Sequence, residues 1–387
     1  RPGPRLRAGT GTALLILDLD EFKQVNDSWG HPVGDRLLAE AADRLRACVR
    51  NTDQIARLGG DEFAVIQTGL KHAEDIIGLA NRIIATLSAP FYLDNRAVTI
   101  GVSIGIALAS DPNTKAQHIM KDADAALYKA KEEGRGIFRF FESGMHTRLQ
   151  ERQELKADLR QALPRDEFRL EYQAIVSLKT GKVIGFEALL RWNHPVRGIF
   201  HPADFIPLAE EIGVIADIGE WVINRACTEA ATWPQDVSIS VNLSPAQMLR
   251  ADLLASISRK LIESGLSAQR LQLEITETVL IKDTDCILSV LLALRNLGVR
   301  IAMDDFGTGH STLNYLRQFP FDTIKIDQSF VADVAGSPQT AIIVRSVIDL
   351  ARGLGISTVA EGIETEDQLE ALRALGCDAG QGYLFSR

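Results

Sequence analysis

At 387 residues the chain is long enough for two or three domains, each with its own hydrophobic core. The apolar and charged fractions are those of ordinary globular proteins, and the net charge of -9 argues against long nucleic acid as a partner. No run of about 18 apolar residues occurs, so we expect no membrane-spanning segment, and four widely spaced cysteines indicate reduced residues of a cytoplasmic protein.

The first part of the chain, to about residue 143, alternates apolar strands with amphipathic helices. An apolar strand ends in Asp18-Leu19-Asp20, and apolar residues at helical spacing follow over 37–48. Further along, the pattern predicts a helix, a hairpin that turns at Asp94-Asn95 and a final helix, over 76–87, 91–107 and 119–130. The final helix leads to Lys131 and Arg135, whose spacing puts both cations on one side of the last turn. They could bind a triphosphate or simply pair with the helix dipole.

A tight hairpin is expected over 54–66, where two short apolar strands flank Gly59-Gly60. Glycine is favoured there because a two-residue turn needs positive φ. The hairpin places Asp61 and Glu62 at its tip, facing Asp18 if the strands pair. Carboxylates from different strands at one edge predict a two-metal site for nucleotidyl transfer, although a solvated hairpin tip is an equally simple alternative.

These motifs resemble the GGDEF family of diguanylate cyclases over most of residues 11–141, through Gly59-Gly60-Asp61-Glu62-Phe63 and the strand before it. The resemblance implies two metal ions when GTP is bound, held by Asp18, the Leu19 carbonyl and Asp61, with Glu62 beside the reacting hydroxyl. It implies guanine contacts from Asn26 and Asp35, and triphosphate contacts from Phe22, Lys23, Lys131 and Arg135. It also implies an inhibitory site for cyclic di-GMP at Arg50 and Asp53.

Two features depart from that family pattern. The chain begins after the helix that usually opens the domain, and the family's Gly-Arg-Asn is Gly134-Arg135-Gly136 here. Two such domains must face each other for synthesis in this family, so the resemblance implies a homodimer that binds GTP and leaves synthesis open. The first residues suggest an internal cut, so we expect a sensory part before them, which could also anchor the full-length protein to a membrane.

Residues 144–165 are charged and prone to form a helix, with leucines at helical intervals and no Pro/Gly-rich composition. This segment predicts a connecting helix between an N-terminal α+β domain over 1–143 and a second domain over 166–387. In the second domain strand-like and helix-like segments alternate, which predicts an α/β fold, a TIM-like (β/α)8 barrel. The strands are expected over 168–173, 183–190, 237–241, 271–275, 299–303, 323–326, 358–360 and near 380–383.

Oxygen-bearing side chains lie near the ends of most of these strands. The clearest case is 301–309, where an apolar strand stops at Asp304-Asp305 and a glycine-rich loop follows. Adjacent side chains of a strand point to opposite faces, so we expect the strand to have ended where the two aspartates converge. Adjacent carboxylates repel unless a cation lies between them. The full set suits magnesium or manganese rather than zinc: Glu187, Asn242, Glu274, Asp304, Asp305 and Glu361.

This second domain resembles the EAL family of cyclic di-GMP phosphodiesterases along nearly its whole length. The resembling blocks include Glu171-Tyr172-Gln173, Glu187-Ala188-Leu189, Asp304-Asp305-Phe306-Gly307, Lys325-Ile326-Asp327 and Gln381-Gly382-Tyr383. The resemblance implies one metal ion at Glu187, Asn242, Glu274 and Asp304, and a second at Asp304, Asp305 and Glu361. It implies that Lys325 positions or deprotonates the attacking water. It implies substrate contacts from Arg191, Gln381 and Gln173, and a loop after Asp305 anchored by Glu277.

The function implied is hydrolysis of cyclic di-GMP to linear pGpG at a pair of magnesium or manganese ions, joined to a GTP-binding domain. The main alternative is a receptor that binds cyclic di-GMP without turnover. Receptors of that kind usually lose metal ligands, and the sequence retains all of those implied here. A scaffold whose domains only dimerise is a third alternative, and His310, where the family usually has Tyr, has no assigned effect.

Overall fold

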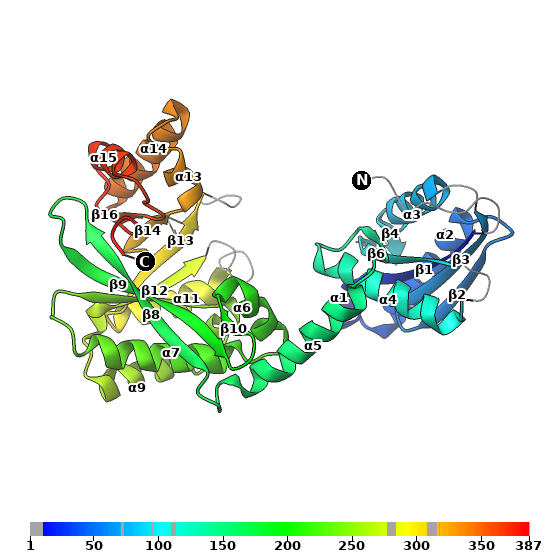
Figure 1. Ribbon diagram of the computed structural model, residues 1–387, viewed down its shortest axis with the longest axis horizontal. Helices are drawn as coiled ribbons and strands as arrows, with labels where there is room; N and C mark the ends of the chain where they lie inside the picture. The colour runs from blue at the N-terminus through cyan, green and yellow to red at the C-terminus, as the bar shows by residue number, and fades with distance from the viewer. Residues whose placement is uncertain are drawn as a thin grey trace. The chain divides into compact units, whose positions relative to one another are not determined.

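The computed structural model describes residues 11–70, 73–93, 96–109, 114–276, 284–307, 316 and 318–386. The chain divides into two compact units, Arg1–Glu154 and Leu155–Arg387, which we call the N-terminal unit and the C-terminal unit (Figure 1). Helix α5, Met145–Ala162, spans the division, and it confirms the helix expected from the charged connecting segment. Among the described residues, none of the helices combines the length and apolarity that a membrane crossing needs.

The N-terminal unit is built on a five-stranded sheet with strand order β2-β3-β1-β6-β7. The strands are β1 Gly11–Asp20, β2 Gln54–Gly59, β3 Glu62–Leu70, β6 Gly101–Ala109 and β7 Phe138–Phe140. The helices are α1 Phe22–Trp29, α2 His31–Cys48, α3 Ala73–Leu87 and α4 Ala116–Glu132. Strand β1 is central because it is apolar on both faces: alternate residues join two separate hydrophobic clusters, Leu15 and Leu17 in one and Leu14 and Ile16 in the other.

The hairpin expected over 91–107 is only partly correct. Strands β4 Phe91–Leu93 and β5 Arg96–Val98 pair with each other, but β6 leaves them and pairs with β1 over nine residue pairs. The expected turn at Asp94-Asn95 lies outside the described residues. The apolar alternation of β6 satisfies either pairing, so local pattern could not choose between them.

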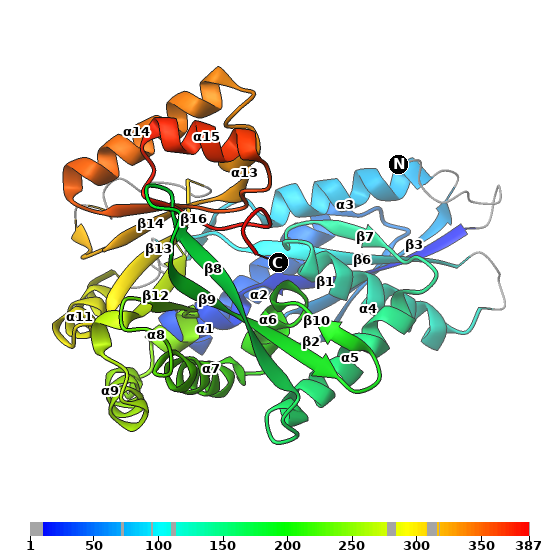
Figure 2. The same cartoon turned by 60° about the vertical axis from the view of Figure 1, so that its left-hand side comes forward.

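The C-terminal unit is a closed barrel of eight strands, as expected (Figure 2). The strands are β8 Phe168–Ser177, β9 Val183–His194, β11 Ser238–Asn242, β12 Leu271–Thr276, β13 Arg300–Phe306, β14 Thr323–Ile326, β15 Ser357–Ala360 and β16 Ala379–Gly380. Neighbours from β9 through β16 are parallel, whereas β8 is antiparallel to both β9 and β16. A short turn, 178–182, joins β8 to β9, and a connection that short permits only an antiparallel pair.

Helices cover the outside of the barrel and a short strand, β10 Gly198–Phe200, extends its edge beside β9. The helices are α6 Pro202–Glu211, α7 Ile215–Ala230, α8 Pro245–Met248, α9 Leu253–Ser264, α11 Thr284–Asn296, α13 Gln328–Ala332, α14 Pro338–Leu354 and α15 Glu366–Leu375, with the 3-10 turn Ala268–Arg270. We call the end where the parallel strands finish the C-terminal mouth, and the end where they begin the N-terminal mouth.

Close contact between β6 and α4 depends on a glycine. A Cβ added at Gly105 would lie 2.0 Å from the Ala123 carbonyl oxygen and 2.2 Å from the Leu127 amide nitrogen. Backbone atoms cannot yield as side chains do, so Gly105→Ala should destabilise the N-terminal unit by roughly 1–3 kcal/mol or more. Gly78→Ala, in the interior of α3 with open space around the added Cβ, is the matched control and should stabilise by up to about 1 kcal/mol.

Differential scanning calorimetry of the full chain measures both effects. We expect the two substitutions to move the unfolding transition of the N-terminal unit in opposite directions. A Gly105→Ala variant as stable as the wild type would show that α4 does not lie against β6 as described.

Candidate active site

A single buried ammonium group stands at the centre of the C-terminal mouth. The Lys325 Nζ lies 2.6 Å from a carboxylate oxygen of Glu274, 2.6 Å from Glu361, 3.2 Å from Glu187 and 3.3 Å from Asp304. Lys325 is only 1% exposed. The four carboxylates belong to different strands or strand ends, so the barrel itself assembles the cluster. One positive charge against four potential negative charges leaves the cluster acidic.

Amide side chains fix the orientation of two of these carboxylates. The Asn242 Nδ2 donates to Glu187 Oε1 at 2.7 Å, and the Gln381 Nε2 donates to Glu187 Oε2 at 2.7 Å and to Glu361 Oε1 at 3.1 Å. Gln173 lies opposite Glu187 in the β8–β9 register. Glu187 is therefore held by Asn242 of β11, Lys325 of β14 and Gln381, which follows β16, and this gives its carboxylate one defined position.

Asp304 and Asp305 converge by a different route from the one expected. Strand β13 continues to Phe306, so the expectation that it stops at Met303 is wrong. Its register against β14 shifts by one residue between Met303 and Phe306, and Asp305 has a left-handed φ of 54°. A bulge of this kind cancels the alternation of a strand. Oxygen atoms of Asp304, Asp305 and Glu361 consequently lie within 4.8 Å of one another.

The electrostatics of this cluster fit hard divalent cations. Burial and the Glu187 charge raise the pKa of Glu274 well above its usual range, against the effect of Lys325. Burial, outweighing Lys325 and reinforced by Asp304 and Glu187, raises the pKa of Glu361 to about 7. Glu274 Oε1 is buried and accepts no hydrogen bond from any described group, and Asp304 Oδ1 accepts none either, although it lies 3.3 Å from Lys325 Nζ. Unpartnered buried carboxylate oxygens are costly, and oxygen donors of this kind are the ligands that magnesium and manganese prefer.

A cavity of about 700 Å³ opens above the cluster. Its lining includes the substrate contacts implied by the resemblance: Gln173, Arg191 and Gln381. The Arg191 Nε is 2.8 Å from Glu171 Oε2. His201 and Gln328 also line the cavity, and sequence reasoning missed both. His201 precedes the Pro that opens α6 and serves as a helix cap, so the local pattern pointed to structure and away from a site.

Two residues singled out from the sequence fall outside the described residues. Glu277, implied as the anchor of the loop after β13, is one, and His310 of that loop is the other. The implied role of Glu277 therefore stays a prediction.

The N-terminal unit brings together the carboxylates expected at its sheet edge. Asp18 lies directly opposite Glu62 in the β1–β3 register, which confirms the predicted pairing of the strands. The Leu19 amide donates to the Asp61 carbonyl oxygen at 3.3 Å, so the end of β1 meets the hairpin tip. The tip is Gly60-Asp61 rather than Gly59-Gly60, because β2 extends through Gly59. Burial raises the pKa of Asp18, although Lys131 Nζ lies 2.6 Å from its Oδ2 and opposes the shift.

The cations expected side by side at the end of α4 are arranged differently. Helix α4 ends at Glu132, and Arg135 lies in the following turn with a left-handed φ of 59°, so helical spacing does not apply to Lys131 and Arg135. Within the described part of the chain no ion pair links Arg135 or Lys23 to Asp18. The turn is instead held by Asp20, whose Oδ2 accepts from the Gly136 amide at 3.0 Å.

The remaining implied contacts of this unit lie on α1, α2 and the turn after α2. A Cβ at Gly34 would be 2.0 Å from Asn26 Oδ1 and 3.1 Å from the Phe22 ring, so both side chains lie over Gly34, next to Asp35. The Arg50 amide donates to Asp53 Oδ2 at 2.9 Å. Arg50 and Asp53 are thus direct neighbours, whereas Asn26 lies against Gly34, the residue before Asp35.

Comparison with known proteins agrees with this geometry. The family model "EAL domain" matches residues 156–387, and the family model "Diguanylate cyclase, GGDEF domain" matches residues 5–136. The chain belongs to the GGDEF–EAL family. The barrel that carries the acidic cluster is therefore an EAL domain, in a family concerned with turnover of cyclic di-GMP.

Two relatives come from Pseudomonas aeruginosa. The bifunctional diguanylate cyclase/cyclic di-GMP phosphodiesterase MucR is 44% identical over 379 residues, which are 97% of this chain and 55% of MucR. The cyclic di-GMP phosphodiesterase NbdA is 39% identical over 387 residues, 99% of this chain and 49% of NbdA. This GGDEF–EAL chain spans about half the length of the curated relatives it matches.

Solved structures resemble the chain as well. The MucR phosphodiesterase in complex with c-di-GMP has a TM-score of 0.58 and 44% identity, over 60% of this chain and 96% of that chain. The EAL enzyme Bd1971 with cAMP and cyclic di-GMP bound has a TM-score of 0.60 and 25% identity, over 100% of this chain and 96% of that chain.

When divalent cations are removed, the stability of the EAL domain should depend on pH, because the acidic cluster destabilises the fold once its carboxylates are charged. Because the folded pKa of Glu361 is about 7, above its unfolded value, this group contributes stability at low pH that is lost as the pH rises. In EDTA we expect the contribution of Glu361 to the free energy of unfolding to fall by roughly 2–3 kcal/mol from about pH 5 to 8. Urea denaturation across that range measures it.

Two variants isolate the effect of Glu361. Glu361→Gln removes the titrating group and should flatten the fall, whereas Glu370→Gln, on the exposed face of α15, should retain the wild-type slope. An equally steep fall in Glu361→Gln would contradict the assignment. Saturating Mn²⁺ should flatten the fall in the wild type as well.

Proposed function

We propose that the EAL domain hydrolyses cyclic di-GMP to linear pGpG at the C-terminal mouth. The observation that carries this proposal is the buried cluster of Lys325 with four carboxylates, beneath a cavity of about 700 Å³. A cavity of that size is ordinary for a small-molecule ligand. The names of two close relatives, MucR and NbdA, support the same substrate and reaction.

The residues present fit a pair of divalent cations. Glu187, Asn242, Glu274 and Asp304 would hold one cation, and Asp304, Asp305 and Glu361 the other. When bound, magnesium or manganese supplies Lewis-acid stabilisation of the negative charge that develops on phosphate oxygens during an in-line displacement. The unpartnered oxygen Glu274 Oε1 supports this assignment, because a cation would satisfy it.

The side chains of the chain itself bind and orient the reactants. Burial opposes the charge of Lys325, but Glu187, Glu274, Glu361 and Asp304 together raise the pKa of Lys325 well above its usual value. A lysine held as an ammonium donates hydrogen bonds, so of the two roles implied by the sequence we assign it positioning of the attacking water. Arg191 is placed to bind a phosphate oxygen through its guanidinium, and Gln173 and Gln381 to bind the rest of the nucleotide.

We propose further that the GGDEF domain binds GTP with magnesium, at the edge formed by Asp18, the Leu19 carbonyl, Asp61 and Glu62. Their convergence at one sheet edge supports the proposal. Synthesis of cyclic di-GMP by this domain is a second candidate activity, favoured by the name of MucR. A receptor without turnover fits less well, since the acidic cluster of the EAL domain is complete.

Hydrolysis should depend on the cluster and not on buried lysines in general. Glu187→Gln and Lys325→Ala should each lower kcat by about 10²–10⁴-fold, because each removes a group that holds or orients the reactants. Lys156→Met is the matched control: Lys156 is also buried and pairs with Glu211 at 2.6 Å, outside the cavity lining, and activity should persist.

The measurement is chromatography of pGpG released from cyclic di-GMP with magnesium, with circular dichroism to verify folding. Lys325→Ala removes the ammonium group that pairs with four buried carboxylates, which destabilises the fold. If the Lys325→Ala variant unfolds, Glu187→Gln provides an independent test. Unchanged turnover in a folded Glu187→Gln variant would refute the proposed site.

GTP binding by the GGDEF domain is tested separately by calorimetry with magnesium. We expect Lys131→Met to weaken binding, because Lys131 lies at the carboxylate edge. Lys129→Met, two residues earlier on α4 and paired with Glu132 and Glu133, is the control and should bind as the wild type does. Absence of heat at millimolar GTP would exclude a GTP site.

A further inference from the structure

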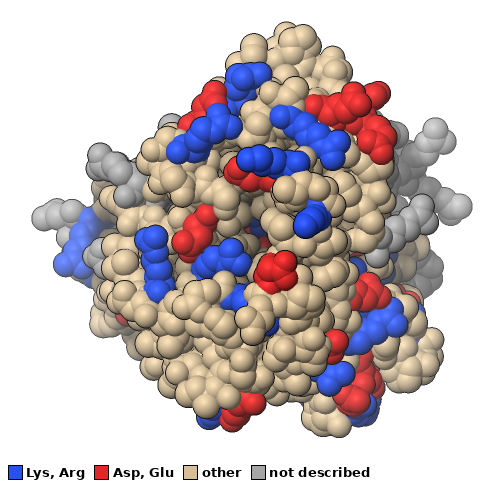
Figure 3. Space-filling model, turned by 90° about the vertical axis from the view of Figure 1, so that its left-hand side faces the viewer, with Lys and Arg blue, Asp and Glu red and all other residues tan. Residues whose placement is uncertain are grey.

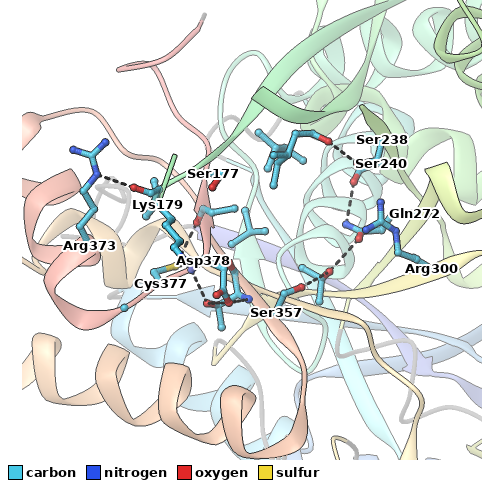
Figure 4. Close-up of a pocket in the computed structure, with 18 residues that line it drawn as sticks. Ser177, Lys179, Ser238, Ser240, Gln272, Arg300, Ser357, Arg373, Cys377 and Asp378 are labelled. Atoms are coloured by element: carbon cyan, nitrogen blue, oxygen red, sulfur yellow. Dashed lines mark hydrogen bonds between the residues drawn. The ribbon is translucent and has the colours of Figure 1, made fainter. Parts of the chain in front are cut away.

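The N-terminal mouth of the EAL barrel contains a second cavity, at the opposite end from the acidic cluster. Its volume is about 600 Å³, within the range of about 300–1000 Å³ that small-molecule sites occupy. The first residues of several parallel strands line it, among them Ser238, Arg300, Thr323 and Ser357, together with the last residues of antiparallel β8 (Figure 4). The strand ends, rather than a surface loop, therefore shape this cavity.

Polar side chains line the cavity on the barrel side, where the interior of such barrels is usually filled by Val, Ile and Leu. The Thr323 hydroxyl donates to Gln272 Oε1 at 3.0 Å, and the Gln272 Nε2 donates to Ser240 at 3.0 Å. All three are at least nine-tenths buried. Thr323 lies two residues before Lys325, Gln272 two before Glu274 and Ser240 two before Asn242, each in the same strand. The three side chains therefore point to the same inward face as those of the acidic cluster. A polar layer therefore separates the second cavity from the acidic cluster.

The charged groups of this cavity are mainly cationic. Arg373 and Lys179 lie on one side and Arg300 on the other (Figure 4), whereas Asp378 is the one acidic residue in the lining, and Thr358 donates to its Oδ2 through both amide and hydroxyl. Figure 3, which faces this end of the barrel, shows Lys and Arg side chains around the middle of the surface with Asp and Glu side chains among them.

The cations of the cavity have spare hydrogen-bonding capacity. Arg300 Nε is buried without a hydrogen-bond partner, so the terminal nitrogens of the Arg300 guanidinium, which no described residue pairs with, are the groups left for a ligand. Burial lowers the pKa of Arg300 despite the opposing charge of Asp322. Arg373 is anchored by its Nε to the Leu178 carbonyl oxygen at 3.1 Å. Within the described residues neither arginine forms an ion pair, so both guanidinium groups can still donate hydrogen bonds to an oxyanion.

We propose that the N-terminal mouth is a binding site for a small hydroxylated oxyanion, such as a phosphorylated or carboxylated sugar, distinct from the cyclic di-GMP site. Arg300 binds the phosphate or carboxylate group, and Arg373 and Lys179, on the other side of the cavity, add positive charge at the rim. The hydroxyl and amide groups of Ser240 and Gln272 pair with hydroxyls of the ligand. The site uses no residue of the acidic cluster, so it does not depend on the proposed hydrolysis.

Isothermal titration calorimetry of the full chain in EDTA tests this site with glucose 6-phosphate, gluconate and neutral glucose as probes. We expect at least one of the charged probes to bind, and glucose to bind at least about tenfold more weakly, because it lacks the charged group that Arg300 binds. The stronger of the two charged probes distinguishes phosphate from carboxylate as the preferred group. No binding of either charged probe at about 10 mM would overturn the proposal.

Variants and hydrogen exchange locate the binding. Arg300→Gln should weaken binding at least about tenfold, and Lys179→Met should weaken it less, because Lys179 is at the exposed rim. Lys182→Met makes the same charge change on the same turn, outside the lining, and should bind as the wild type does. In the wild-type chain the bound probe should protect amides of 176–182 and 372–379 from exchange. Equal binding by all three variants, or protection confined to other segments, would refute the site.

Discussion

The EAL domain depends on one interaction, the burial of the Lys325 ammonium among carboxylates from four separate strands or strand ends. Each of those carboxylates would be costly to bury alone, and the desolvation of a charge is repaid only by close, well-oriented partners. Lys325 partly neutralises Glu187, Glu274, Asp304 and Glu361, and the amides of Asn242 and Gln381 hold two of them in place. The negative charge that Lys325 leaves unneutralised would attract divalent cations. The stability of the cluster and the proposed chemistry therefore have one physical origin, the excess of carboxylates over cations.

The two mouths of the barrel show how strand periodicity divides one structure into different environments. Ser240, Gln272 and Thr323 share strands and an inward face with Asn242, Glu274 and Lys325, two residues further on. The C-terminal mouth collects carboxylates, while the N-terminal mouth collects hydroxyl groups and guanidinium groups. Under the two proposals, the barrel would bind a cation-dependent ligand at its acidic end and an anion at its opposite end.

Much of this arrangement could be predicted from local pattern. Apolar runs and helical periodicity located α5, the central strand of the GGDEF sheet and the strands of the barrel, since each depends on residues close in sequence. The meeting of Glu187, Glu274, Asp304 and Glu361 was also predictable, because the C-terminal ends of parallel strands lie at one face whatever separates them in the chain. The hydrogen bonds of Asn242 and Gln381 to Glu187 were not predicted: strand-end position put Asn242 among the metal ligands, and the family resemblance implied Gln381 as a substrate contact.

The sequence by itself determined the types of structure, the order of the two domains and the residues with metal-binding chemistry. Tertiary structure alone decided that β8 runs antiparallel, that β6 pairs with β1 and that a bulge turns Asp305 toward Asp304. It also decided that Arg300 and Arg373, far apart in the chain, line one cavity. The physical reason is that pairing partners and left-handed backbone conformations are selected by the energy of the whole packed structure, which local propensity does not contain.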